Sequence, residues 1–229
     1  MYNINSMNVH REPPYRFAVS LAGISLVALG LLAVRVATSD SFRYGFMVWN
    51  LVLATVPLVL AWWLVTRVDR LGWLSWQQII LTLAWIVFLP NSFYLITDFV
   101  HLRVNYEADI FFDIGLLTSF VLAGLMYGYV SVYMVHQRLL KRMRERSTYL
   151  LLGLLFLAVS FAICLGRYTR WNTWDILLKP AGLLFDVSER VINPNAHLQT
   201  YATTAVMFLL LFGGYAIVYE AIRLIKSTK

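Results

Sequence analysis

The sequence has little charge and almost no cysteine. Only 14% of its 229 residues are charged and 60% are hydrophobic, against roughly 25% charged and 45–50% apolar residues in soluble domains. So few charged side chains exclude an ordinary soluble globular domain, and the apolar excess has to face lipid. The single cysteine, Cys164, excludes an internal disulfide and a cluster of thiolate metal ligands.

Acidic residues are scarcer than basic ones, with 12 Asp and Glu against 19 Lys and Arg, so the formal net charge is +7. A basic excess can serve nucleic acid binding, but here the basic residues cluster in short connections between apolar runs. Such clustering is typical of membrane topology signals. We therefore expect no nucleic acid partner.

Apolar runs of at least eighteen residues recur along nearly the whole chain. A helix rises about 1.5 Å per residue and the hydrocarbon core of a bilayer is roughly 30 Å thick, so each run can cross it. The sequence predicts an all-α fold, a polytopic membrane helix bundle that forms a single domain over residues 1–229 with the lipid bilayer as its partner. Six membrane-spanning helices are expected, at about residues 16–38, 45–66, 73–97, 110–137, 148–168 and 198–225.

The connections between the expected spans alternate between many and few basic residues (Lys and Arg). Twelve lie in the N-terminal tail, the second and fourth connections and the C-terminus, and seven lie on the other side. Cytoplasmic connections of membrane proteins carry the excess of basic residues. We therefore expect a multi-pass protein of the cell (plasma) membrane with both termini in the cytoplasm.

The longest connection, from about residue 167 to residue 197, belongs to the outer side in this orientation. In it, apolar residues recur at three- and four-residue spacing between two prolines, which predicts an amphipathic helix at the membrane interface. This helix would cover the outer ends of the spans, and a solvated loop with some helix is the alternative. The spaced residues are Leu183, Leu184, Val187, Val191 and Ile192.

Most of the unusual polar residues of the expected spans fall at the outer end. Isolated ionisable groups near hydrocarbon are costly, so they usually pair with one another or line a wet cavity. We therefore expect a polar site at the outer face. Its candidate catalytic residues are Asp98, His101 and Asp113, and its candidate substrate-binding residues are Asn50, Asn91, Tyr94, Arg167, Arg170, Asn172 and Asp175.

Asp98 and His101 are three residues apart, so a helix would place them on one face. The carboxylate could then fix the imidazole tautomer, or both could join Asp109 and Asp113 in a site for a hard cation or zinc. Helix capping or pairing with arginine explains the same carboxylates, and the chain has no double-histidine metal motif. The sequence therefore assigns no metal and no cofactor.

Arg167 and Arg170 are also three residues apart, at the outer end of the fifth expected span. Two guanidinium groups on one helical face suit a carboxylate or a phosphate, and Trp171 and Trp174 repeat the spacing as an interfacial aromatic belt does. One interpretation is an anion site for a lipid headgroup or another acidic substrate. The other is a structural ion pair with carboxylates of neighbouring spans.

Three stretches of the chain, within about residues 45–180, carry a family resemblance. There the chain resembles a bacterial family of integral membrane proteins catalogued as domain of unknown function 1361. The resemblance implies a multi-span protein of a bacterial inner membrane, but it implies no reaction, substrate or catalytic residue. The matching stretches are Trp49-Asn50 with Leu53-Ala54 and Pro57, Phe88-Leu89-Pro90-Asn91 through His101, and Gly166-Arg167 through Asp175, in which Thr173 replaces the expected serine but keeps the hydroxyl.

Three functions are compatible with an outer polar site. The first is a membrane-embedded enzyme for a lipid-linked or anionic substrate, in which the arginines hold the anion, Asp98 or Asp113 is the base and His101 carries a proton. The second is a small transporter or proton-coupled carrier, which would need more ionisable groups in the inner halves of the spans. The third is a non-catalytic scaffold or assembly factor, and the sequence assigns no oligomeric state.

The expected orientation puts positions 101 and 142 on opposite sides of the membrane. After His101→Cys, a membrane-impermeant thiol reagent added to intact cells should label the protein. After Arg142→Cys, it should label only once the membrane has been opened. Labelling of both positions from the same compartment would contradict the outer placement of the polar site.

Overall fold

The apolar runs of the sequence fold as long helices. The computed structural model describes residues 14–39, 42–102 and 110–228, and this part of the chain contains helices and turns but no strand. In chain order the elements are α1 (Pro14–Ser39), α2 (Phe46–Leu71), α3 (Trp76–Tyr94), the 3₁₀ helix η1 (Leu95–His101), α4 (Ile110–Leu139), α5 (Glu145–Tyr168), α6 (Asp175–Leu178), α7 (Pro180–Ile192), the 3₁₀ helix η2 (Pro194–His197) and α8 (Leu198–Ser227).

Six segments in the described residues are long and apolar enough to cross a membrane, which confirms the six predicted spans. Their bounds lie within five residues of the expected ones. The largest difference is at the end of α2, which continues to Leu71. The long charged side chains in this last part of the helix can still reach water. The protein is thus a multi-span helix bundle. The segments are Ala18–Thr38, Phe46–Leu71, Trp76–His101, Ile110–Leu139, Glu145–Tyr168 and Pro194–Ser227.

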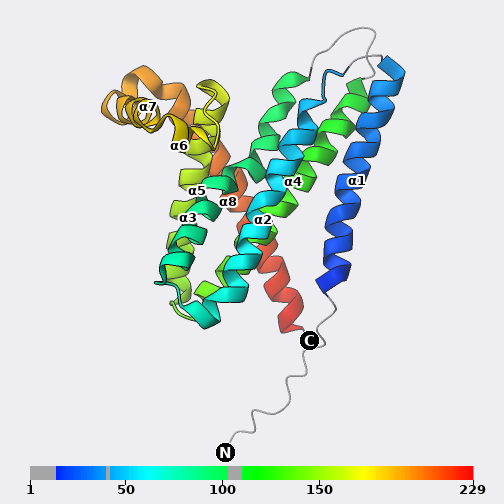
Figure 1. Ribbon diagram of the computed structural model, residues 1–229. Coiled ribbons are helices and arrows are strands. Elements are labelled where there is room, and N and C mark those ends of the chain that lie inside the picture. The colour runs from blue at the N-terminus through cyan, green and yellow to red at the C-terminus, as the bar shows by residue number, and fades with distance from the viewer. Residues whose placement is uncertain (1–13, 40–41, 103–109, 229) are drawn as a thin grey trace, which may run out of the picture.

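The predicted amphipathic helix is α7, which begins at Pro180. Proline suits the first turn of a helix because the backbone N–H that it lacks has no partner there. The short helix α6 precedes α7 and was not expected from the spacing of apolar residues. Figure 1 shows α6 and α7 together at one end of the bundle, beside the end of α5.

The spans pack as two neighbouring groups that share α4. A cluster around Leu117 and Phe120 joins α1, α2 and α4, and a cluster around Phe93, Phe156 and Tyr215 joins α3, α5 and α8 with α2 and α4. Half of the most apolar window of α4 is buried, the largest share of any span. Helix α4 therefore forms the centre of the bundle, with α1 on one side of it and α5 and α8 on the other (Figure 1).

The two ends of the bundle differ in chemistry. We call the end that carries η1, α6 and α7 the site end, and the opposite end, where α1 begins and α8 ends, the basic end (Figure 1). Arg11 and Lys229, which belong to the expected cytoplasmic set, lie outside the described residues. Other members of that set gather at the basic end: Arg67, Arg70, Arg138, Lys141, Arg142, Arg144, Arg146, Arg223 and Lys226.

Helices α3 and α4 approach closely at Gly124. A Cβ atom built on Gly124 would lie 2.4 Å from the backbone oxygen of Ser92. Contacts this short force the backbone to shift, so the absence of a side chain at position 124 lets α3 lie against α4. The close contact helps to fix the position of α3, from which η1 continues to the site end.

We predict that Gly124→Ala destabilises the protein although alanine favours helix more than glycine does. Overpacking of this kind costs about 1–3 kcal/mol, and the thermal unfolding midpoint in detergent should fall. Gly115→Ala on the same helix is the matched control, because a Cβ atom there meets nothing within 4 Å and should leave the midpoint equal or higher. Equal midpoints for the two variants would contradict the close packing of α3 on α4.

Candidate functional site

A cavity of about 1040 Å³ lies at the site end, between α2, α3 and η1 on one side and α5, the following loop and α7 on the other. The structure brings eight of the ten candidate site residues to its walls. Asp113 and Asp175 are the two that do not line it. The eight are Asn50, Asn91, Tyr94, Asp98, His101, Arg167, Arg170 and Asn172.

Asp98 lies at the centre of the polar contacts in this cavity. Its side chain is fully buried, and its Oδ2 accepts a hydrogen bond of 3.1 Å from Nδ2 of Asn50. Its Oδ1 lies 3.7 Å from Nη1 of Arg167. A buried carboxylate needs such partners because desolvation of an unpaired charge is costly. The contacts connect α2, η1 and α5 at one point.

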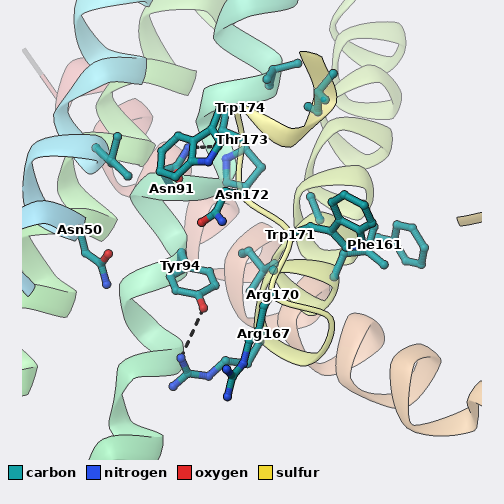
Figure 2. A pocket seen from close by; sticks show the side chains of 18 of the residues that line it. Asn50, Asn91, Tyr94, Phe161, Arg167, Arg170, Trp171, Asn172, Thr173 and Trp174 are labelled. Carbon is teal, nitrogen blue, oxygen red and sulfur yellow. Dashed lines mark hydrogen bonds between the residues drawn. The ribbon is translucent and has the colours of Figure 1, made fainter. Parts of the chain in front are cut away.

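Arg167 reaches this carboxylate from the last turn of α5. Its Nη2 donates a hydrogen bond of 2.6 Å to the backbone oxygen of Thr97, and its Nη1 donates one of 3.4 Å to the Tyr94 hydroxyl (Figure 2). The guanidinium carbon also lies 5.7 Å from the centre of the Tyr94 ring. Arg167 is therefore held in place by α3 and η1, and Asp98 compensates its charge.

Arg170 differs from Arg167 in both backbone and environment. Helix α5 ends at Tyr168, so the prediction that both arginines share one helical face is wrong, because the helix stops before Arg170. The backbone of Arg170 has φ of 58°, in the left-handed region. This position follows the C-cap Thr169, where glycine is the usual residue because a side chain strains the backbone.

The side chain of Arg170 remains available to a ligand. It is exposed and lines the cavity, and the structure shows no ion pair for it among the residues that it describes. Figure 2 shows it beside Arg167 and Tyr94. The cavity thus contains one compensated guanidinium group and one uncompensated one, an arrangement that can hold a carboxylate or phosphate.

The loop after α5 is held by polar side chains at three points. The backbone N–H of Asn172 donates to Oδ2 of the buried Asp175 at 2.8 Å, and Nδ2 of Asn91 donates to the Thr173 hydroxyl at 2.8 Å. Nε1 of Trp171 donates to Oδ2 of Asp186 on α7 at 2.6 Å. Asp175 therefore orders the loop and lies behind the cavity wall, while Thr173 and Trp171 connect the loop to α3 and α7.

His101 lines the cavity at the end of η1. Its ring makes an edge contact with Phe46, with centroids 4.9 Å apart, and its backbone oxygen accepts a hydrogen bond from Arg43. Because η1 is a 3₁₀ helix with three residues per turn, Asp98 and His101 lie in line along it. The two residues therefore share a face, as their spacing predicts.

Asp113 belongs to a different polar cluster, between α1 and α4. Nε of Arg35 lies 2.6 Å from its Oδ1, and the Tyr44 hydroxyl donates a hydrogen bond of 3.0 Å to its Oδ2. Burial and the hydrogen bond to Asp113 raise the pKa of Tyr44, which keeps its hydroxyl a donor. Asp113 thus joins α1 to α4, in agreement with its interpretation as an ion-pair partner.

The metal interpretation depended in part on Asp109, which lies outside the described residues. Within the part of the chain that the structure describes, no group of three or more His, Cys, Asp or Glu side chains is arranged to hold a metal ion. The two candidate carboxylates that the structure describes each lie beside an arginine: Asp98 beside Arg167 and Asp113 beside Arg35.

Several apolar cavity residues had not been expected. Those on α2, α3 and α5 lie deeper in the bundle than the polar residues of the same helices, and those on α7 lie at the site end. Helical spacing was a signal for the deeper ones, because Leu53 follows Asn50 by three residues and Val87 precedes Asn91 by four. The apolar members include Leu53, Val87, Phe161, Ala162, Ile163, Leu183 and Val187.

Comparison with known proteins agrees with the resemblance of the motifs. Residues 49–216 match the family described as "Protein of unknown function (DUF1361)". The chain belongs to the DUF1361 family. No curated protein and no solved structure matches it. The part of the DUF1361 protein that matches the family runs from α2 into α8, so α1 lies outside the matched range. Of the ion pair between α1 and α4, Arg35 lies outside this range and Asp113 inside it.

We predict that Arg35→Leu destabilises the protein strongly, because it leaves the buried Asp113 carboxylate without its charged partner. The expected loss is about 3 kcal/mol, measured as a fall in the thermal unfolding midpoint. The double variant Arg35→Leu with Asp113→Leu should recover much of this loss, since both charges are then absent. A single variant as stable as the parent protein would contradict a structural role for the pair.

Proposed function

We propose that this DUF1361 protein is a membrane-embedded enzyme that acts on an anionic substrate in the cavity. The observation that carries the proposal is Arg170, an arginine without an ion pair in the described residues, at a position where glycine would be less strained. Strained backbone is often found at functional sites. The side chain is therefore expected to contribute an interaction that outweighs its conformational cost.

The anion contacts Arg170 first and Arg167 second in this proposal. Arg167 already has its charge compensated by Asp98 at 3.7 Å, so it contributes orientation and hydrogen bonds rather than a free charge. Planar guanidinium groups bind carboxylates and phosphates through paired hydrogen bonds. The polar end of the cavity also contains the amide side chains of Asn50 and Asn172, which suit the neutral oxygens of a substrate, while the amide of Asn91 donates to Phe88 and Thr173 and holds the loop.

Asp98 is the proposed acid or base. Its Oδ1 accepts no hydrogen bond among the described residues and faces Arg167 at 3.7 Å, so a lone pair remains that can accept a proton. A general base has to be held in position within reach of the proton that it removes. Asn50 and Arg167 provide that positioning, and His101, one 3₁₀ turn further along η1, is the proposed proton carrier.

The proposal sets the basic end in the cytoplasm and the cavity at the outer face of the cell membrane. The concentration of arginine and lysine at the basic end supports this orientation, because positively charged connections are retained on the cytoplasmic side. An outer-facing site would meet substrates in the outer leaflet or in the medium beyond it.

A proton-coupled carrier is the second candidate, and one observation favours it. His136 is fully buried in the basic-end half of α4, its Nδ1 lies 2.7 Å from the Tyr215 hydroxyl, and its ring lies 4.5 Å from that of Tyr219. The sequence had indicated few ionisable groups at this depth. Uptake of the anion into proteoliposomes, driven by a pH gradient, would favour the carrier over the enzyme.

The anion site predicts that Arg170→Gln weakens binding of a phosphate-bearing probe without destabilising the fold. Dioctanoyl phosphatidic acid, titrated against the purified protein in detergent, should bind at least about tenfold more weakly, because a charge-assisted hydrogen bond contributes about 1.5–3 kcal/mol. Lys179→Gln is the matched control, since Lys179 is exposed in the same connection but does not line the cavity. Unchanged binding after Arg170→Gln would contradict the proposal.

Asp98→Asn separates the enzyme from a scaffold. The variant keeps the shape of the side chain but removes the charge that compensates Arg167. The enzyme proposal therefore expects it to fold with a lower thermal unfolding midpoint and to bind the probe at least as tightly as the parent protein, but not to complement a strain that lacks the protein. If the protein is instead a non-catalytic scaffold, every variant that folds should complement that strain.

A further inference from the structure

The cavity changes from polar to apolar along its depth, and it does so on three helices in the same direction. On α2, Leu53 lies one turn deeper than Asn50, and on α3, Val87 lies one turn deeper than Asn91. On α5, Phe161 lies six residues deeper than Arg167, which corresponds to about 9 Å along the helix axis. On these three helices the polar residues therefore lie at the outer part of the cavity, and its deep part is apolar.

The deep half of the cavity is lined by side chains that the protein does not cover completely. Leu53, Val87, Phe161 and Ala162 are all half-buried, although they lie within membrane-spanning segments. Water in such a space would lack hydrogen-bond partners, and apolar cavities of this kind stay dry or hold apolar ligands. Figure 2 shows Phe161 well apart from the two arginines. The deep half is thus suited to hydrocarbon.

The volume also exceeds what a small anion needs. Sites for drug-sized molecules are about 300–1,000 Å³, and this cavity, at about 1040 Å³, is slightly larger than that range. A phosphate or carboxylate held by Arg170 would occupy only its polar end. A ligand that fills the cavity therefore has a second, apolar part.

The rim of the cavity is apolar and exposed. Trp49 on α2 is 56% exposed and Val100 on η1 is 68% exposed, and both line the cavity. Tryptophan is typical of the headgroup level of a bilayer. On the opposite wall, α7 contributes Leu183 and Val187 to the cavity while Leu184 points outward and is exposed. The side of the rim formed by α2 and η1 and the side formed by α7 are therefore both compatible with direct contact between the cavity and lipid.

We infer that the ligand of this cavity is an amphiphile from the bilayer, with an anionic headgroup at Arg170 and Arg167 and a hydrocarbon tail between α2, α3 and α5. The headgroup part rests on the proposed function. The tail part rests on the apolar deep half of the cavity and is tested separately. A free phosphate or carboxylate from the medium shares the headgroup chemistry but leaves the deep half empty.

The test compares two probes that differ in the tail. Dioctanoyl phosphatidic acid and glycerol 3-phosphate are each titrated against the purified full chain in detergent, with bound probe measured by native mass spectrometry. The parent protein should bind the lipid at least tenfold more tightly. Ala162→Trp, which fills the deep half, should weaken lipid binding at least tenfold and leave glycerol 3-phosphate unchanged. Leu154→Trp is the control, because Leu154 lies on α5 but faces outward, 66% exposed.

The outcomes separate the tail from the headgroup. Equal affinity for the two probes, or lipid binding that survives Ala162→Trp, would overturn the amphiphile and leave a small anion as the ligand. Unchanged affinity for both probes after Arg170→Gln would instead overturn the anion site itself. Val87→Phe blocks the same space from α3, so it replaces Ala162→Trp if that variant loses its thermal unfolding transition.

Discussion

The buried carboxylate of Asp98 constrains the arrangement of the whole site end. It lies inside a membrane-spanning segment with no exposed surface, where an unpaired charge costs several kcal/mol. Asn50 on α2 and Arg167 on α5 therefore have to reach it from opposite sides. Meeting that requirement keeps α2, η1 and α5 around one point, and the cavity lies between them.

A second buried carboxylate performs a different task at the same end of the bundle. Asp113 holds Arg35 and Tyr44, so it joins α1 to α4. With Asp98 and Asp113 each paired to an arginine, Arg170 is left without an acidic partner in the described part of the chain. The fold thus gives Arg35 and Arg167 a carboxylate partner, whereas the cavity residue Arg170 has no such partner among the described residues.

Much of the fold could be predicted because the bilayer restricts the length of each helix and the end of the bundle at which each connection lies. Hydrocarbon thickness sets the length of each apolar run, and alternation of the spans brings Asn50, Asp98 and Arg167 to one end whatever the packing. The direction in which each side chain points around its helix depends on tertiary contacts, which periodicity does not determine. For that reason the sequence grouped Asp113 with Asp98, whereas packing of α1 against α4 sets it apart.

The loop after α5 shows that residue spacing did not determine the backbone conformation either. Spacing alone placed Arg167 and Arg170 on one helical face, but the helix ends at Tyr168 and Arg170 adopts the left-handed conformation that reverses the chain. Glycine is the usual signal for such a helix end, and it is missing here. The apolar depth of the cavity was missed for a simpler reason, since residues such as Phe161 and Ala162 resemble any lipid-facing residue in the sequence.

The coupling between Asp98 and Arg167 is the most direct measure of this account. In a double-mutant cycle of Asp98→Asn and Arg167→Gln, followed by the free energy of unfolding, the account predicts a coupling of about 1 kcal/mol or more, because removal of Arg167 leaves the Asp98 carboxylate buried without a charged partner and removal of Asp98 leaves the half-buried Arg167 unpaired. Additive effects of the two substitutions would show that the carboxylate and the guanidinium group do not depend on each other, and would contradict the account.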